Sequence, residues 1–191
     1  MGAIRRSTSR ASDFDAERFE VLAQKWALLA DGERGTVLLN DCKYGHDIHG
    51  HVMRLSLIKS ATSPDPVADQ GRHVFTYAFL PIAKLDRTEL DHAAYDLNAP
   101  LRVALGPEVA PVIEAPSGVV VETVRPVDGE IEYRFFEARR EAQKVQLSFA
   151  TKLKRLRVTD IFGVTQKELP AAETVELSLR PTEIVTLRAT F

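Results

Sequence analysis

The sequence predicts an all-β protein, an antiparallel β-sandwich with one short crossover helix. Many short runs are rich in β-branched and aromatic residues, several alternate apolar with polar positions, and turn residues separate them. The clearest turn is Asp128-Gly129, which stands between two strand-like runs and is a strong hairpin signal. Short strands joined in this way are typical of sandwiches and barrels.

The segment Phe14–Leu29, before the first clear strand, is ambiguous. Leu22, Trp26 and Leu29 recur at helical spacing. The alternative is a pair of strands, Phe19–Leu22 and Lys25–Leu29. Periodicity alone does not decide between the two.

The next two predicted strands, Thr36–Asn40 and His51–Ile58, flank a dense polar segment. Residues 40–47 read NDCKYGHD and are interpreted as a loop. Polar side chains at this density between apolar strands are unfavourable unless they meet a partner. This segment is therefore the first candidate for a functional site.

A strand over His73–Leu80 is predicted to end at Pro81, because proline cannot donate to a sheet. Asp86 and Glu89 then resemble a capping box, apolar residues follow at helical spacing, and Asn98 ends the helix. The remaining predicted strands are Val119–Arg125, Ile131–Ala138, Val145–Phe149, Leu153–Val158, Val175–Leu179 and Ile184–Thr190.

Composition excludes several classes of function. The formal charge of -2 gives no global attraction to nucleic acid or an anionic membrane. No apolar run approaches the roughly 20 residues of a membrane helix, and the single cysteine forms no internal disulfide. A cytoplasmic protein is expected. Apolar residues before Gly35 favour association into a homo-oligomer if nothing covers them.

Five segments in order resemble the C-terminal β-sandwich of glycoside hydrolase family 38, the α-mannosidases. They are SDFDAERFEV at 12–21, the segment from LLNDCKYG to LSLIKS at 38–60, PDPVADQGRHVFTYA at 64–78, AYDLNAPL at 94–101 and LRPTEIVTL at 179–187. The resemblance implies that the ambiguous early segment is extended. It divides the chain into a strand arm at 1–34 and the sandwich at 35–191. One departure is that residues 137–141 lack the glycine expected after Ala138.

The resemblance also implies a function. Family enzymes hydrolyse terminal α-mannosides in oligosaccharides with retention, using an aspartate nucleophile and zinc in an N-terminal α/β domain. None of those motifs matches this chain, so no catalytic residue, metal site or cofactor is assigned to it, and zinc is expected in the absent catalytic domain. That domain and a mannose-containing oligosaccharide are the expected partners. The alternatives are a stand-alone carbohydrate-binding or assembly module and an inert fragment of a truncated gene.

The resemblance places the polar segment near the sugar site. Lys43 would donate hydrogen bonds to sugar hydroxyls, Tyr44 would stack on a sugar face, and Asn40 and Asp41 would hold the loop backbone. The alternative is that the loop packs on a neighbouring domain without touching sugar. The candidate substrate-binding residues are Asn40, Asp41, Lys43, Tyr44 and Asp47.

The same segment holds a candidate metal cluster, which we disfavour. On an extended chain His49 and His51 would face the same side, and His46 lies nearby. A histidine pair of this spacing needs a further ligand, and the sequence names none. A solvated loop leading into a strand is the favoured interpretation.

Overall fold

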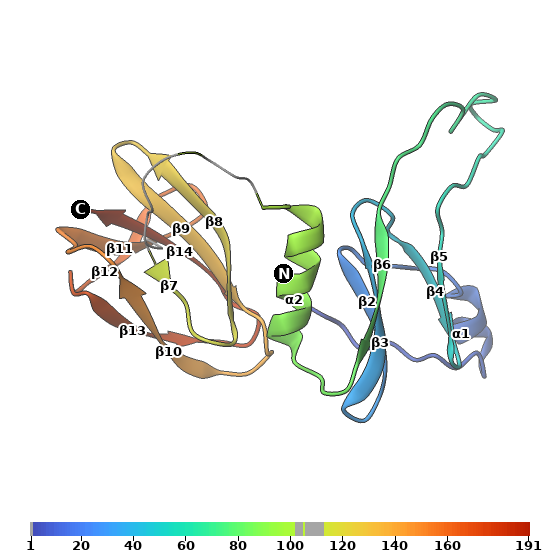
Figure 1. Cartoon of the computed structure of the whole chain (residues 1–191), viewed down its shortest axis with the longest axis horizontal. Coiled ribbons are helices and arrows are strands. Elements are labelled where there is room, and N and C mark those ends of the chain that lie inside the picture. The colour runs from blue at the N-terminus through green and yellow to red at the C-terminus, as the bar shows by residue number, and fades with distance from the viewer. Residues whose placement is uncertain (1, 102–104, 106–112) are drawn as a thin grey trace. The chain divides into compact units, whose positions relative to one another are not determined.

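The computed structural model of the protein describes residues 2–101, 105 and 113–191 (Figure 1). The chain forms two compact units, one of residues 4–102 and one of residues 103–191 together with residues 1–3. Every pair of neighbouring strands in the described residues is antiparallel. The predicted all-β class is confirmed.

The unit of residues 4–102 combines two small sheets with two helices. Its elements are α1 (Asp13–Glu17), β1 (Val21–Leu22), β2 (Trp26–Asp31), β3 (Arg34–Asn40), β4 (Gly45–His49), β5 (Val52–Leu55), β6 (Tyr77–Ile82) and α2 (Arg87–Asn98). The strands form two three-stranded sheets with the orders β1-β4-β5 and β2-β3-β6.

Helix α2 covers one face of the sheet β2-β3-β6 (Figure 1). Val37 and Leu39 of β3 are buried against Leu90 and Ala94 of the helix. Alternate residues of a strand point to one face, so the period-2 pattern of β3 places its apolar side chains toward the helix. The predicted helix start is confirmed, because Asp86 caps the helix by accepting from the backbone amides of the first turn.

Residues 4–34 belong to this unit. Strands β2 and β3 form a hairpin in which Asp31 pairs with Arg34, so the boundary expected between residues 34 and 35 lies inside this hairpin. Trp26 packs against the same helix, and its Nε1 donates to Oδ1 of Asp91 at 2.7 Å. Part of the apolar surface that we expected to be uncovered is therefore covered within the unit.

The early segment is extended only from Val21 onward. Residues 14–17, part of the segment Phe14–Leu29 that the resemblance predicted as extended, instead lie in α1, where the Ser12 hydroxyl accepts from the Asp15 backbone amide at 3.2 Å and caps the helical turn. The predictions for β6 are also corrected. It begins at Tyr77 and continues through Pro81 to Ile82. Proline is tolerated there because β6 is an edge strand, paired among the described residues with β3 alone.

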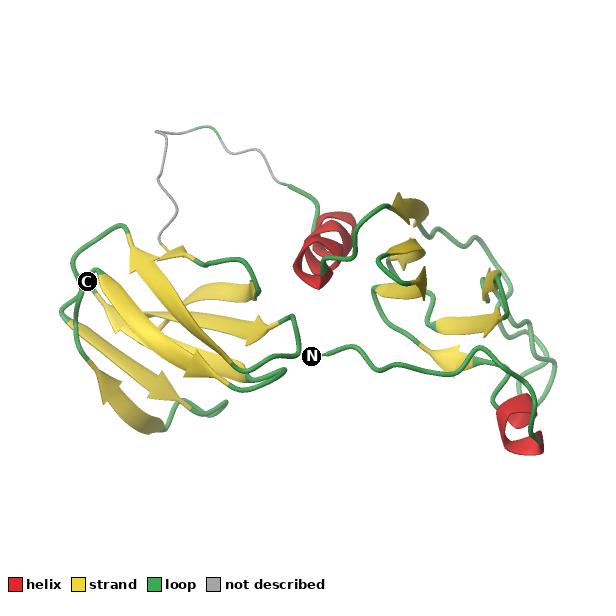
Figure 2. Ribbon diagram, turned by 90° about the horizontal axis from the view of Figure 1, so that it is seen from below, coloured by secondary structure: helices red, strands yellow, loops and turns green. Residues whose placement is uncertain are grey.

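The unit of residues 103–191 is a sandwich of two sheets (Figure 2). One sheet has five strands in the order β12-β11-β14-β9-β8, and the other has three in the order β13-β10-β7. The strands are β7 (Ile113–Glu114), β8 (Val119–Val127), β9 (Glu130–Glu137), β10 (Gln143–Phe149), β11 (Arg155–Thr159), β12 (Thr165–Leu169), β13 (Thr174–Leu179) and β14 (Ile184–Thr190).

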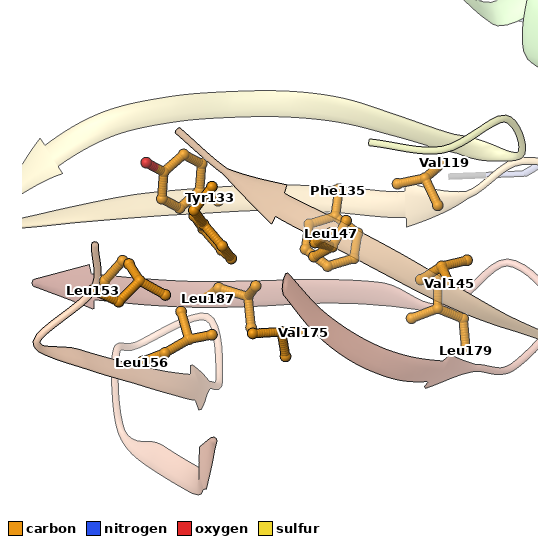
Figure 3. Packing of buried hydrophobic residues seen from close by; sticks show 12 residues of the cluster. Val119, Tyr133, Phe135, Val145, Leu147, Leu153, Leu156, Val175, Leu179 and Leu187 are labelled. Atoms are coloured by element: carbon orange, nitrogen blue, oxygen red, sulfur yellow. The ribbon is translucent and has the colours of Figure 1, made fainter. Parts of the chain in front are cut away.

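The core of the sandwich lies between these sheets (Figure 3). Leu147 of β10 is fully buried, as are Phe135 of β9 and Leu187 of β14 from the opposite sheet. The ring of Tyr133 meets that of Phe149 edge to face, with centroids 5.8 Å apart. Side chains from both sheets thus fill one apolar layer, as in sandwiches generally.

Charged side chains form ion pairs on the sheet β12-β11-β14-β9-β8. Glu132 is 1% exposed, and its carboxylate accepts from Nε of Arg125 at 2.9 Å and from Nε of Arg188 at 3.3 Å. Burial opposes ionisation of Glu132, but the arginines outweigh it and hold the pKa of the carboxyl below its usual value. Arg157 forms a further ion pair with Glu130.

Across the described ranges, neither helix is long and apolar enough to cross a membrane.

Candidate functional site

The turn that joins β3 to β4 carries most of the predicted site residues. It consists of residues 41–44, because Asn40 ends β3 and Gly45 begins β4. The predicted loop over residues 40–47 is therefore too long. Strand β4 exists because Gly45–His49 pairs with β1 on one side and with β5 on the other, and these long-range pairings are not visible in the local polarity.

Asn40 holds the conformation of the turn through hydrogen bonds of its side chain. Its side chain is completely buried. Its Oδ1 accepts from the backbone amide of Lys43 at 2.8 Å, and its Nδ2 donates to the carbonyl of Gln24 at 3.3 Å. The first of these bonds is a side-chain-to-backbone bond of the kind that stabilises Asx turns. The conformation of residues 40–43 is therefore set before any ligand arrives.

The end of helix α2 supports the same turn. Nδ2 of Asn98 donates to the carbonyl of Asn40 at 3.0 Å and to that of Ala94 at 2.8 Å. Sequence reasoning treated Asn98 only as a helix terminator. The role of Asn98 could have been suspected because it lies in AYDLNAPL, one of the segments that carry the family resemblance.

Asp41 ties the turn to the segment before β6. The backbone amide of Asp41 donates to the carbonyl of Thr76 at 3.1 Å, and the amide of Thr76 donates to Oδ2 of Asp41 at 2.8 Å. Hydrogen bonds from the Cys42 thiol and from Thr76 hold the pKa of Asp41 below its usual value. The neighbouring carboxylate raises the pKa of Cys42, so this exposed thiol is not activated as a nucleophile.

Lys43 projects over an aromatic pair that the sequence did not single out. Its Nζ lies 4.9 Å from the ring centroid of Phe75, a cation–π contact. Phe75 in turn stacks with Tyr77, at 6.5 Å between centroids. Tyr77 is 55% exposed, and Tyr44 on the turn is 47% exposed. The site thus presents two exposed phenol rings to solvent, beside a half-buried lysine and the half-buried ring of Phe75.

Asp47 does not join this cluster. It lies in β4, where its carboxylate pairs with Arg10 and, at 2.8 Å, with Nη1 of Arg54. Burial opposes ionisation, but the two arginines prevail and hold the pKa of Asp47 below its usual value. Both partners are arginines of the same unit. In this arrangement Asp47 therefore has a structural role.

The three histidines of the segment do not converge on a metal site. His46 is fully buried, and its Nδ1 bonds the carbonyl of Tyr44 at 3.1 Å, whereas His49 ends β4 and His51 follows in the turn to β5. Burial lowers the pKa of His46, even though that hydrogen bond opposes the shift. Among the residues that the structure describes, no three His, Cys, Asp or Glu side chains are grouped to hold a metal ion. The residues of this segment do not fit a zinc ion.

Comparison with protein families decides the affiliation of the chain. Residues 1–67 match the family model described as the glycosyl hydrolases family 38 C-terminal domain. Residues 118–187 match the model of the family 38 C-terminal beta sandwich domain. The chain belongs to the C-terminal region of glycoside hydrolase family 38.

Curated relatives agree with this assignment to family 38. The chain is 39% identical over 132 residues to "Alpha-mannosidase 2C1" of Mus musculus, which covers 65% of this chain and 13% of the relative. It is 38% identical over 141 residues to the protein of that name from Homo sapiens, covering 70% of this chain and 14% of the relative. The family 38 chain therefore spans only a small share of the length of these relatives.

A solved structure gives the same fold. An α-mannosidase from Enterococcus faecalis V583 superposes with a TM-score of 0.67 over 88% of this chain and 21% of the other, at 18% sequence identity. At this identity the likeness shows the fold alone, and it agrees with the family 38 assignment.

Proposed function

We propose that this chain completes the substrate cleft of a zinc-dependent retaining α-mannosidase, which removes terminal α-linked mannose from oligosaccharides. The observation that carries the proposal is the fixed turn at residues 41–44. Asn40 is buried and bonds the backbone of the turn, Tyr44 is exposed, and Lys43 is half-buried with its ammonium over the ring of Phe75. Because such a turn is already ordered, the binding of a sugar costs little conformational entropy of the protein.

The chemistry of these side chains suits a sugar. The Lys43 ammonium can donate to hydroxyls, and the exposed faces of Tyr44 and Tyr77 offer flat apolar surfaces for sugar rings. Asn40 and Asp41 act through the backbone of the turn and are positioning residues in this proposal. We retain Asp47 only as an indirect contributor, through its pairs with Arg10 and Arg54.

The reacting groups come from elsewhere in this proposal. Retaining hydrolysis needs a carboxylate nucleophile and a second carboxyl that acts as acid and then as base. We assign both, and the zinc ion, to an α/β catalytic domain of the same family, which is the expected partner of this chain. We also place the protein in the cytoplasm, because the exposed thiol of Cys42 suits a reducing compartment.

A complementation assay tests the proposal. The purified chain is assayed on an aryl α-mannoside alone, with added zinc, and after mixing with a family 38 catalytic domain that lacks its own C-terminal region. We expect no turnover from the chain alone and turnover from the mixture. Turnover by the isolated chain would contradict the proposal. An inactive mixture together with tight binding of mannose oligosaccharides by the chain alone would favour a stand-alone binding module.

A further inference from the structure

A cavity of about 480 Å³ lies beside α1 and β4 and has no role in the function proposed above. Four arginines line it, namely Arg5, Arg6, Arg10 and Arg18. All of them belong to the unit of residues 4–102, so the cavity is formed within one unit. Its volume falls in the range of small-molecule sites.

The positive charge of this arginine cavity is largely uncompensated. Asp15 is the acidic residue of its lining. Arg10 pairs with Asp47, but Asp47 also neutralises Arg54. In the described part of the chain, no ion pair involves Arg5, Arg6 or Arg18. A hollow with an excess of positive charge concentrates the field and attracts an anion.

Neutral groups hold two of these arginines in place. Nη2 of Arg6 donates to the carbonyl of Leu22 at 3.3 Å, and the guanidinium of Arg18 lies 3.9 Å from the ring centroid of Phe14. Each contact restricts the side chain but removes no charge. The remaining donors of both guanidinium groups stay available to a ligand, since each group carries five N–H bonds.

Two serines add neutral donors to the arginine cavity. Oγ of Ser7 accepts from the amide of Ser9 at 3.1 Å, and Oγ of Ser9 accepts from the amide of Ala11 at 3.2 Å. Both serines line the cavity. A hydroxyl that accepts in this way still has its own hydrogen to donate.

The extended segment that carries these residues is fastened to the β4–β5 hairpin. The amide of Gly50 donates to the carbonyl of Thr8 at 3.1 Å, and Arg10 pairs with Asp47 of β4. Phe19, Val21 and Ile48 supply apolar lining. The arginine cavity therefore offers cationic groups to an anionic head group and apolar side chains to the body that carries it.

We propose that the arginine cavity binds a phosphate monoester, whose phosphate contacts Arg5, Arg6 and Arg18. A phosphate dianion has three free oxygens, and arginine binds such oxygens through two parallel N–H bonds. It offsets several guanidinium charges at once, whereas a carboxylate offsets one. The apolar lining favours an ester over inorganic phosphate. The organic part of an ester covers these side chains, whereas inorganic phosphate leaves them exposed to water.

Calorimetric titration of the full chain tests this proposal with three probes, hexose 6-phosphate, inorganic phosphate and the neutral hexose. We expect hexose 6-phosphate to bind, inorganic phosphate to compete with it, and the neutral hexose not to bind. Arg5→Gln and Arg18→Gln should each weaken binding about tenfold, the effect of one lost charge-assisted hydrogen bond. Arg34→Gln is the matched control, because this exposed arginine lies outside the cavity and its loss should leave binding unchanged.

Two outcomes overturn the proposal. One is the absence of hexose 6-phosphate binding up to about 10 mM, beyond the range of weak specific sites. The other is binding that Arg34→Gln weakens as much as Arg5→Gln and Arg18→Gln do, which indicates non-specific charge attraction. Circular dichroism of each variant confirms that the fold is retained, so a loss of binding reports on the cavity.

Discussion

Nδ2 of Asn98, in the last turn of α2, donates to the backbone carbonyl of Asn40 at 3.0 Å. This bond joins the end of a helix to the start of the turn that carries Lys43. The turn is thus supported both by the buried Asn40 side chain and by the helix that covers the neighbouring sheet.

Removal of the Asn98 side chain should loosen this support. We expect Asn98→Ala to lower the free energy of unfolding of the unit by about 1 kcal/mol, the usual worth of a net hydrogen bond. Trp26 is the single tryptophan of the chain and lies in this unit, so its fluorescence during urea unfolding measures the change. Asp96→Ala removes an exposed side chain from the same helix and should shift stability by less than about 0.5 kcal/mol. Equal effects of the two substitutions would contradict the role of Asn98.

Glu137 should be a major determinant of stability in the sandwich. Its buried carboxylate accepts from the backbone amides of Arg139 at 2.6 Å, Arg140 at 2.8 Å and Thr182 at 2.9 Å. Glu137→Gln places an amide group among these donors, and we expect a loss of about 2–3 kcal/mol. Hydrogen exchange of β9 and β10 reports the loss within this unit. Glu173→Gln, at an exposed position, is the control, and a loss as large in that variant would refute the prediction.

Arg140 lies in the segment of residues 137–141, in which the family resemblance led us to expect a glycine after Ala138. Its φ is +65°, in the left-handed region that disfavours side chains. Because the side chain is exposed and glycine adopts this φ freely, Arg140→Gly should raise stability by about 1 kcal/mol. Thermal unfolding measures this change, and Arg140→Ala, which keeps the Cβ, should give little of the gain. A decrease in melting temperature for Arg140→Gly would contradict the argument.

His46 should make the unit of residues 4–102 sensitive to mild acid. Burial lowers the pKa of the folded imidazole, whereas in the unfolded chain it titrates near 6.5. The unfolded state therefore binds the proton more readily, and stability is complete above about pH 6.5 and falls as the pH drops below it. Trp26 fluorescence follows unfolding across pH 5–8. His46→Gln should flatten this dependence, and His51→Gln, in the hairpin turn, should preserve it. A pH profile unchanged in His46→Gln would assign the effect to another group.

Regular strands could be predicted because burial leaves a local signature. Val145, Leu147 and Phe149 alternate with polar residues and face the core as expected. By contrast, β12 has the sequence TQKEL and was missed, because its position depends on pairing with β11 rather than on an apolar face. The strand character of Gly45–His49 was missed for the same reason.

The candidate site was predictable only in its outline. The segment NDCKYG pointed to a special turn, and Asn40 does bond its backbone. Asn98 and Thr76 contact the turn from 58 and 35 residues away in the chain, which no local pattern reveals. Asp47 was grouped with the turn by proximity in sequence, yet the register of β4 directs it to arginines.

The most direct test of the central claim compares Lys43→Ala with Lys59→Ala in the complex of this chain with a family 38 catalytic domain. Lys59 is an exposed lysine of the same unit, outside the turn, and serves as the control. We predict that Lys43→Ala lowers kcat/KM for an aryl α-mannoside by about tenfold, because one charge-assisted donor to the substrate is lost. The melting temperature of the Lys43→Ala variant should not change. The Lys59→Ala variant should keep the kcat/KM of the unsubstituted complex. An unchanged kcat/KM in Lys43→Ala would place the turn outside the sugar site and contradict the account.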